Sequence, residues 1–280
     1  DSKSLKNKIS KDYKKYNKQI IDLDKKIGSS KEKIIYKGDE LRRRQFLAGM
    51  NIEDLELILH PMVEETKEAT GSMGDDTPVA VLSDKYRPLS HFFRQNFSQV
   101  TNPPIDSLRE NEVMSLKTRF GNTGNILDFE NLTKDNIYVL EGPVLSNAQF
   151  EKFSIFFKKN IRVLDCTFNI NKNLKKKLDE LRSEAEIAVR EGGRHLILTD
   201  KAVDENKAPI PMALAIGAIN SRLTELGIRG FTSINVQTGE VLDTHSFAVL
   251  LGVGATTINS YIAFDSIYQR YEKGLFGKIS

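Results

Sequence analysis

The pattern that most constrains this chain is a series of short apolar segments that alternate with helical segments from about residue 138 onward. Four segments have the length and composition of buried strands: Ile137–Leu140, Arg162–Asp165, His195–Asp200 and Phe231–Val236. Three segments of helical periodicity lie between them: Ala148–Phe157, Leu174–Arg190 and Met212–Leu226. Strands joined by helices of this length need crossover connections. The sequence therefore predicts an α/β fold with a mainly parallel sheet and covering helices, either an incomplete barrel or an open wound sheet.

Residues 1–50 carry the positive charge of the chain. They contain 12 Lys and 3 Arg against 7 acidic residues, a net charge of +8, which leaves −5 for residues 51–280 because the whole chain is +3. Apolar residues recur there every three or four positions, which predicts an amphipathic helix with a solvated lysine face: Leu5, Ile9, Tyr13, Tyr16, Ile20 and Leu23. Acidic residues interrupt the basic face, so we expect no nucleic-acid partner.

The stretch between this N-terminal helical segment and the first predicted strand alternates helices with turns. Asn51 is a suitable N-cap for a helix over residues 52–59 that stops at Pro61. Residues 71–78 form a Gly- and Asp-rich loop, and residues 89–97 have a helical pattern. We expect a basic helical lead-in at 1–50 and an α/β domain at 51–280. A polar, turn-rich stretch at 128–135 is the place for a further subdivision.

Composition excludes several classes of protein. The single cysteine, Cys166, permits no intrachain disulfide and lies in an apolar run, which predicts a buried strand residue. No apolar run reaches the roughly 18 residues of a membrane span, and the N-terminus has no signal-peptide core. We expect a cytoplasmic protein without a membrane partner. Because the chain begins at Asp1 without Met, we also expect an internal piece of a longer protein.

Two residues are candidates for chemistry at the ends of predicted elements. Asp200 follows a predicted strand, and the carboxyl ends of parallel strands are where ligands bind in α/β folds; a loop-capping role is the alternative. His245 precedes an apolar helix, and nearby Asp243 is a candidate cap. No pair of histidines has the spacing of metal ligands. The loop at 71–78 lacks the Lys and Ser or Thr of a phosphate-binding loop, which favours a structural turn.

Several long strings resemble the central region of glutamate synthase large subunits. They are Gly71–Pro78, Gln99–Glu110, Leu55–Met62, Leu196–Asp200, Ala208–Pro211 and Phe247–Phe264. The resemblance covers about residues 40–268. It implies a rudimentary version of a TIM barrel that is not catalytic alone. The parent enzyme would be an oxidoreductase acting on CH–NH2 donors that makes glutamate from glutamine and 2-oxoglutarate.

The same resemblance implies the surroundings of the domain. Its partners would be the amidotransferase and FMN domains of the parent chain, between which it would help to wall an ammonia tunnel. FMN and an iron–sulfur cluster would belong to the parent, with none in this fragment, and the electron donor would be a small NADPH-linked subunit or ferredoxin. A photosynthetic eukaryotic source would place the protein in the plastid stroma. Tunnel or docking residues would be Thr101, Asn102, Pro103, Pro104, Asp200 and His245.

Three positions depart from the family pattern. Ser246 follows His245 where a second histidine is common, Val253 replaces a tyrosine, and Ser260 replaces a proline. These changes argue against an indispensable role at those positions. The alternative function is a stand-alone, barrel-like enzyme that binds phosphate or flavin at the strand ends near Asp200, Asn235 and His245.

Overall fold

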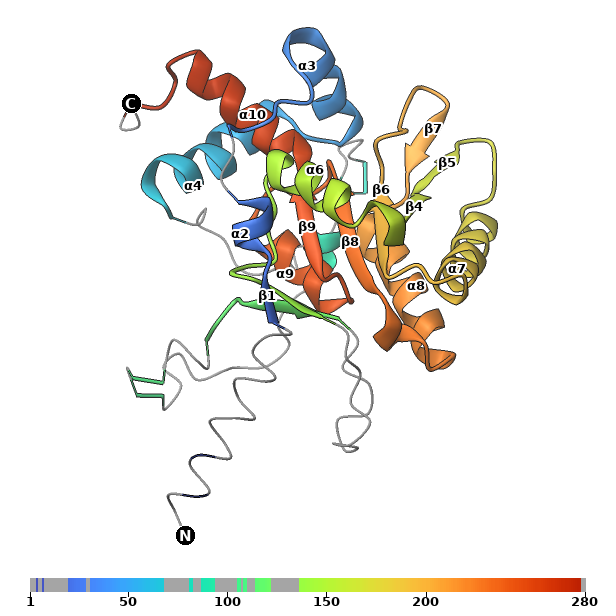
Figure 1. The fold of residues 1–280 in the computed structure, drawn as a ribbon. Coiled ribbons are helices and arrows are strands. Elements are labelled where there is room, and N and C mark those ends of the chain that lie inside the picture. Colours follow the sequence, from blue (N-terminus) through green and yellow to red (C-terminus); the bar gives the residue numbers. More distant parts are fainter. Residues whose placement is uncertain are drawn as a thin grey trace.

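The computed structural model describes residues 4, 7, 20–28, 31–67, 81–82, 87–93, 105–106, 108–109, 114–121 and 136–277. Its central element is a four-stranded, all-parallel sheet with the order β4-β6-β8-β9 (Figure 1). The strands are β4 (Ile161–Asp165), β6 (His195–Thr199), β8 (Ser233–Thr238) and β9 (Thr257–Ser260). The helices that connect or follow them are α7 (Leu174–Arg190), α8 (Met212–Glu225), α9 (Thr244–Gly252) and α10 (Tyr261–Glu272).

One face of the main sheet is apolar and carries the larger core. Alternate strand residues such as Leu196, Leu198 and Ile234 pack against α7, α8 and α9 and are fully buried. Helix α7 begins where the Asn173 side chain accepts a hydrogen bond from the Lys176 amide at 3.2 Å, which satisfies a donor that the helix leaves free. This burial fixes the register of the strands, since a slip of one residue would turn the apolar set outward.

The opposite face of the main sheet meets α6 (Asn147–Phe156), which begins with a capping box of Ser146 and Gln149. Phe150 and Phe153 of this helix, together with Phe157, pack on Ile197 of β6. Leu23 and Ile27 from the N-terminal part join the same cluster and are fully buried. A second, aromatic core therefore lies on this face of the main sheet, which we call the inner face.

Two small sheets flank the main one. β3 (Ile137–Leu140) pairs in parallel with β1 (Ile20–Asp22) and antiparallel with β2 (Thr118–Phe120). β5 (Thr167–Asn169) and β7 (Lys207–Pro209) form an antiparallel pair. Val144 forms a single parallel bridge to Ile258, which extends the main sheet by one residue beyond β9. Within the described residues the main sheet is open and no closed barrel is formed.

The remaining helices lie around the ends of the main sheet. They are α2 (Asp24–Ile27), α3 (Gly38–Leu47), the π-helix η1 (Asp54–Leu59), α4 (His60–Glu65), and the short 3-10 helices η2 (Leu89–Phe92), η3 (Lys158–Asn160) and η4 (Arg229–Phe231). Helix α3 lies over the carboxyl ends of the main strands and packs against α10 (Figure 1). Glu56 of η1 forms a bidentate ion pair with the buried Arg270 of α10, and both N–O distances are 2.9 Å.

The structure confirms the α/β class and the mainly parallel sheet. Helix α7 has the predicted bounds, and α6, α8, β4 and β6 lie within one residue of theirs. The predicted strand at 137–140 exists, but it belongs to the small sheet with β1 and β2. The predicted strand at 231–236 begins two residues later, because residues 229–231 form the 3-10 helix η4.

Two helix predictions were wrong at their ends. The expected amphipathic helix reached Leu23, yet residues 20–22 are strand β1, because pairing with β3 satisfies their backbone groups and buries Leu23. The helix that begins after Asn51 runs through Pro61 to residue 65. Pro61 lies in the first turn of α4, directly after the π-helical segment, where its missing N–H is not needed.

Other predictions fall on residues outside the described ranges. These are most of the basic lead-in, the loop at 71–78, residues 94–97 of the helix at 89–97, and the subdivision at 128–135. Residues 89–92 of that helix are present as the 3-10 helix η2.

Candidate functional site

Asp200 lies at the carboxyl end of β6, as predicted, and is 4% exposed. Its carboxylate accepts hydrogen bonds from the Thr238 hydroxyl at 2.6 Å, the Gly239 amide at 3.0 Å and the Tyr261 hydroxyl at 3.0 Å. Burial raises the pKa of Asp200, although these donors favour its charged form. Thr238 ends β8 and Tyr261 follows β9, so one carboxylate joins the ends of three strands.

The same contacts limit what Asp200 can do chemically. Both of its oxygens are occupied by donors of the protein, so neither is presented to an outside group. Burial also raises the pKa of Tyr261, and the neighbouring Asp200 adds to this effect, which keeps the phenol protonated as a donor. Asp200 and its three donors thus form a structural bracket that links the loops after β6, β8 and β9.

His245 lies in the first turn of α9 and contacts a different part of the chain. Its Nε2 is 2.8 Å from the carbonyl oxygen of Ser90, in the 3-10 helix η2. Asp243 is the N-cap of α9 and accepts a hydrogen bond from the Ser246 amide at 2.8 Å. The residue that departs from the family pattern, Ser246, thus takes part in this cap. No hydrogen bond or ion pair joins His245 to Asp243 or to Asp200 among the described residues, so these residues form no catalytic set there.

The remaining predicted residues divide into two groups. Thr101, Asn102, Pro103 and Pro104 lie outside the described residues. Asn235 is fully buried in the middle of β8. Cys166 is buried, as predicted, but it lies between β4 and β5 and not within a strand. Burial raises the pKa of its thiol, which makes it unreactive as a nucleophile.

The sequence did not indicate a polar network on the inner face of the main sheet. Asn235 donates to the Ser233 hydroxyl at 2.8 Å and to the Leu196 carbonyl at 3.2 Å, and it accepts from the Thr257 hydroxyl at 2.8 Å. Ser233 in turn lies 2.8 Å from Nδ1 of His195. These side chains come from three neighbouring strands. The pairing of these side chains cannot be predicted from one sequence, because whole helices separate the strands along the chain.

A second part of the network reaches the N-terminal segment. Gln237 donates to Asn259 at 3.0 Å, Asn259 donates to Asn147 at 2.9 Å, and Asn147 donates to Asp265 at 3.0 Å. Asp265 also accepts from the amides of Ile35 and Tyr36 at 3.1 and 2.8 Å. Buried polar groups that are all paired in this way specify one arrangement of the elements around them.

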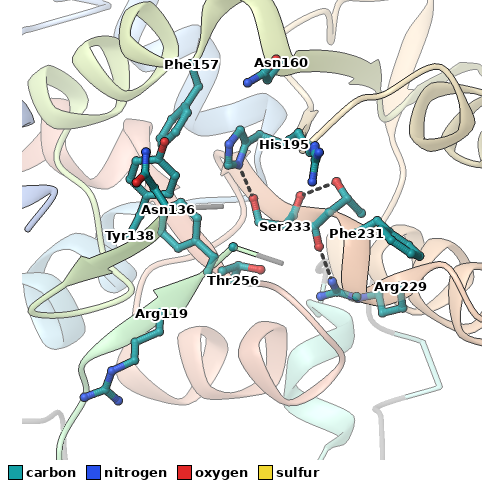
Figure 2. A pocket seen from close by; sticks show the side chains of 15 residues that line it. Arg119, Asn136, Tyr138, Phe157, Asn160, His195, Arg229, Phe231, Ser233 and Thr256 are labelled. Carbon is teal, nitrogen blue, oxygen red and sulfur yellow. Dashed lines mark hydrogen bonds between the residues drawn. The ribbon is translucent and has the colours of Figure 1, made fainter. Parts of the chain in front are cut away.

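His195 connects the network to the aromatic core. Its ring lies 4.0 Å from that of Phe157 and meets Phe153 and Phe120 edge-on. Burial, and to a lesser degree the charge of Arg194, lowers the pKa of His195 to about 4, so the ring is neutral at pH 7. Figure 2 shows His195 and Ser233 pointing toward one another, with Phe157 beside the imidazole.

A cavity of about 420 Å³ opens at the amino ends of β6 and β8, next to His195 (Figure 2). Three arginines line it, Arg119, Arg194 and Arg229, and its lining residues include no carboxylate. Arg229 donates to the Asn220 side chain at 2.7 Å and to the carbonyls of Thr232 and Gly254 at 2.7 and 2.9 Å. Since all of these acceptors are neutral, Arg229 joins α8 to two loops without an ion pair in the described structure, and burial lowers its pKa.

The described residues contain no group of three or more His, Cys, Asp or Glu side chains that could hold a metal ion. Neither end of the main sheet brings together a nucleophile, a base and an orienting acid among these residues. The strand ends that carry catalytic groups in barrel enzymes are occupied here by the bracket around Asp200.

Known sequences are similar to most of this chain. The profile of the family described as "Glutamate synthase central domain" matches residues 43–279. The chain belongs to this family. It is 56% identical over 243 residues to the glutamate synthase [NADPH] large chain of Azospirillum brasilense, which covers 86% of this chain and 16% of that protein.

Two further relatives show the breadth of the family. The glutamate synthase [NADPH] large chain of Bacillus subtilis is 38% identical over 84% of this chain and 15% of its own length. The chloroplastic ferredoxin-dependent glutamate synthase of Spinacia oleracea is 37% identical over the same shares. The central-domain chain thus spans about a sixth of the length of the relatives it matches. No helix in the described ranges has the length and apolar composition of a membrane span.

Proposed function

We propose that this chain connects the amidotransferase and FMN domains of a glutamate synthase large chain and contributes part of the wall of an ammonia tunnel between them. It performs no catalysis alone. The observation that carries this proposal is the bracket at the carboxyl ends of β6, β8 and β9, where Asp200 is saturated by internal donors. A barrel enzyme keeps reactive groups at this position, whereas a connecting domain needs rigidity.

The fold supports descent from a barrel. Four parallel strands follow one another in the order of the chain, with α7 and α8 packed on the outside, as in one half of an eight-stranded barrel. The inner side is filled by α6 instead of by further strands. We propose that the domain is a rudimentary TIM barrel that has lost closure.

The parent protein would supply the cofactors and partners. FMN, an iron–sulfur cluster and an electron donor, either an NADPH-linked small subunit or ferredoxin, belong in this proposal to other parts of the parent enzyme. The reaction would yield glutamate from glutamine and 2-oxoglutarate in the cytoplasm, or in the plastid stroma of a photosynthetic eukaryote.

The tunnel proposal is tested in the full-length parent enzyme with Thr101→Val and Asn102→Ala. A leaking wall releases ammonia before it reacts, so the glutamine hydrolysed per 2-oxoglutarate consumed should rise above one, with free ammonium in solution. Asp179→Asn, on the exposed side of α7, is the control and should keep the ratio at one. A ratio of one in both tunnel variants would contradict a role for these residues.

The connecting role is tested separately with the isolated chain. Titration with FMN should give no saturable change in flavin fluorescence, and the purified protein should be colourless. Tight FMN binding, with a yellow protein, would instead support a stand-alone flavin enzyme.

A further inference from the structure

A second cavity, of about 360 Å³, lies at the carboxyl ends of β6 and β8 beneath α3. It is at the opposite end of the main sheet from the cavity in Figure 2. Its walls are mainly apolar and come from α3, the turn after it, the end of β7, the N-cap of α8 and the start of α10: Phe46, Leu47, Ala48, Pro209, Pro211 and Ile262. The volume is in the range of small-molecule sites, and the position is the one at which barrel folds bind ligands.

Glu240 gives this cavity one acceptor. Its Oε2 accepts a hydrogen bond from the Met212 amide at 2.8 Å, at the first turn of α8. Its Oε1 has no hydrogen-bond partner in the described part of the chain. Burial raises the pKa of Glu240, and the nearby charge of Asp200 adds to this effect. A cationic group beside Oε1 would favour the ionised carboxylate.

Arg44 gives the cavity one fixed donor. Its Nε bonds to Glu40 at 2.8 Å, and its Nη1 bonds to the carbonyls of Lys201 and Val203, both at 3.0 Å. The guanidinium also stacks 4.8 Å from the ring centre of Tyr36, and the side chain is 14% exposed. Nη2 has no partner among the described residues. A guanidinium held on its other edges is preorganised to donate to a carboxylate.

Asp200 also lines this cavity, but it is not available to a ligand because its oxygens are saturated. It instead holds Gly239, the residue before Glu240, through the Gly239 amide. The cavity therefore offers one cation, one anion and an apolar wall, all on backbone that the bracket fixes.

We propose that this cavity binds a free α-amino acid with an aliphatic side chain. Arg44 takes the carboxylate, Glu240 takes the ammonium group, and the side chain packs on Phe46, Pro209 and Pro211. A zwitterion matches the opposite charges of Arg44 and Glu240. A phosphate would be repelled by Glu240, and a purely apolar ligand would leave Nη2 of Arg44 and Oε1 of Glu240 without partners. This site is independent of the connecting role proposed above and can exist whether or not that role is correct.

The first test is calorimetric titration of the 280-residue chain at pH 7 with L-leucine. The analogues 4-methylpentanoate, which lacks the ammonium group, and 3-methylbutylamine, which lacks the carboxylate, should each bind at least about tenfold more weakly, because each leaves one charged group of the cavity unpaired. Absence of saturable L-leucine binding up to about 10 mM, or equal binding of the three compounds, would overturn the proposal.

The second test uses two variants and a matched control. Glu240→Gln keeps an acceptor for the Met212 amide but removes the charge, and should weaken L-leucine binding at least about tenfold. Phe46→Ala should also weaken it, without loss of folding, because Phe46 is 82% exposed. Phe231→Ala, at the other cavity, should bind L-leucine as the unaltered chain does. Unchanged affinity in Glu240→Gln would place the ligand elsewhere.

Discussion

Asp200 illustrates at the scale of one residue how a carboxylate at a strand end can serve structure instead of catalysis. In barrel enzymes such a group faces a ligand, whereas here Thr238, Gly239 and Tyr261 use its acceptor sites. Sequence reasoning located Asp200 at a strand end. It could not decide its role, because the three donors come from segments 38 or more residues further along the chain.

We expect Asp200→Ala to lower the free energy of unfolding by about 3 kcal/mol, because three buried donors lose their shared acceptor. Urea denaturation followed by circular dichroism measures this change. Asp179→Asn, an exposed acid on α7, is the control and should change the stability by less than about 0.5 kcal/mol. Equal effects of the two substitutions would show that the bracket contributes nothing.

His195 should make the stability depend on pH below neutrality. Its pKa is about 4 in the folded chain, against about 6.5 when it is exposed, so between these values the unfolded chain binds a proton that the folded chain does not. The stabilisation that comes from the neutral His195 is fully present above pH 6.5. As the pH falls towards 4 it is lost, and the free energy of unfolding decreases by about 3 kcal/mol in total. In His195→Gln the stability should fall correspondingly less over this interval.

Nuclear magnetic resonance measures the same titration directly. The imidazole signals of His195 should titrate with a midpoint near pH 4 in the folded chain. A midpoint near 6.5 would mean that its contacts with Phe157 and Ser233 do not keep the ring neutral.

At the scale of elements, α9 holds the 3-10 helix η2 through the side chains of His245 and Ser246. His245 Nε2 contacts the Ser90 carbonyl, and Ser90 Oγ lies 3.4 Å from the hydroxyl of Ser246. We expect His245→Ala to speed amide hydrogen exchange in residues 89–93 about tenfold, because the loss of one such bond removes about 1.5 kcal/mol of local stability. Exchange in the main sheet should not change.

Thr244→Ala is the matched control for this substitution. Thr244 is exposed in the same turn of α9, and no hydrogen bond joins its side chain to the described part of η2. The control should leave amide hydrogen exchange at residues 89–93 as it is in the original chain. Faster exchange throughout the protein in His245→Ala would instead indicate that α9 itself has unfolded.

The elements differ in how far the sequence predicts them. Helix α7 and strand β6 were predicted closely because their periodicity alone places one face in the core. Strand β9 was not predicted, since Thr257, Asn259 and Ser260 make it polar and their partners lie on distant segments. The polar network on the inner face of the main sheet was not predicted for the same reason. In each case the deciding contacts are tertiary and leave no local periodic signal.

At the scale of the whole molecule, the N-terminal elements pack into the α/β body. Leu23 and Ile27 are fully buried in the aromatic core, and Leu41 of α3 is fully buried against Tyr261 of α10. Asp265 also accepts hydrogen bonds from the backbone amides of residues 35 and 36. We therefore expect that residues 20–50 cannot be separated from residues 51–280 without loss of stability, although the composition of the chain changes near residue 50.

Two truncated chains, one beginning at residue 20 and the other at residue 51, test this expectation. Both lack residues 1–19, so a difference between them belongs to residues 20–50. The shorter chain should be less stable by at least about 4 kcal/mol, since the sites of three fully buried aliphatic side chains become exposed or empty. Urea denaturation measures the difference. Equal stability would place a true domain boundary near residue 50 and would mean that α3 docks on α10 without holding the body together.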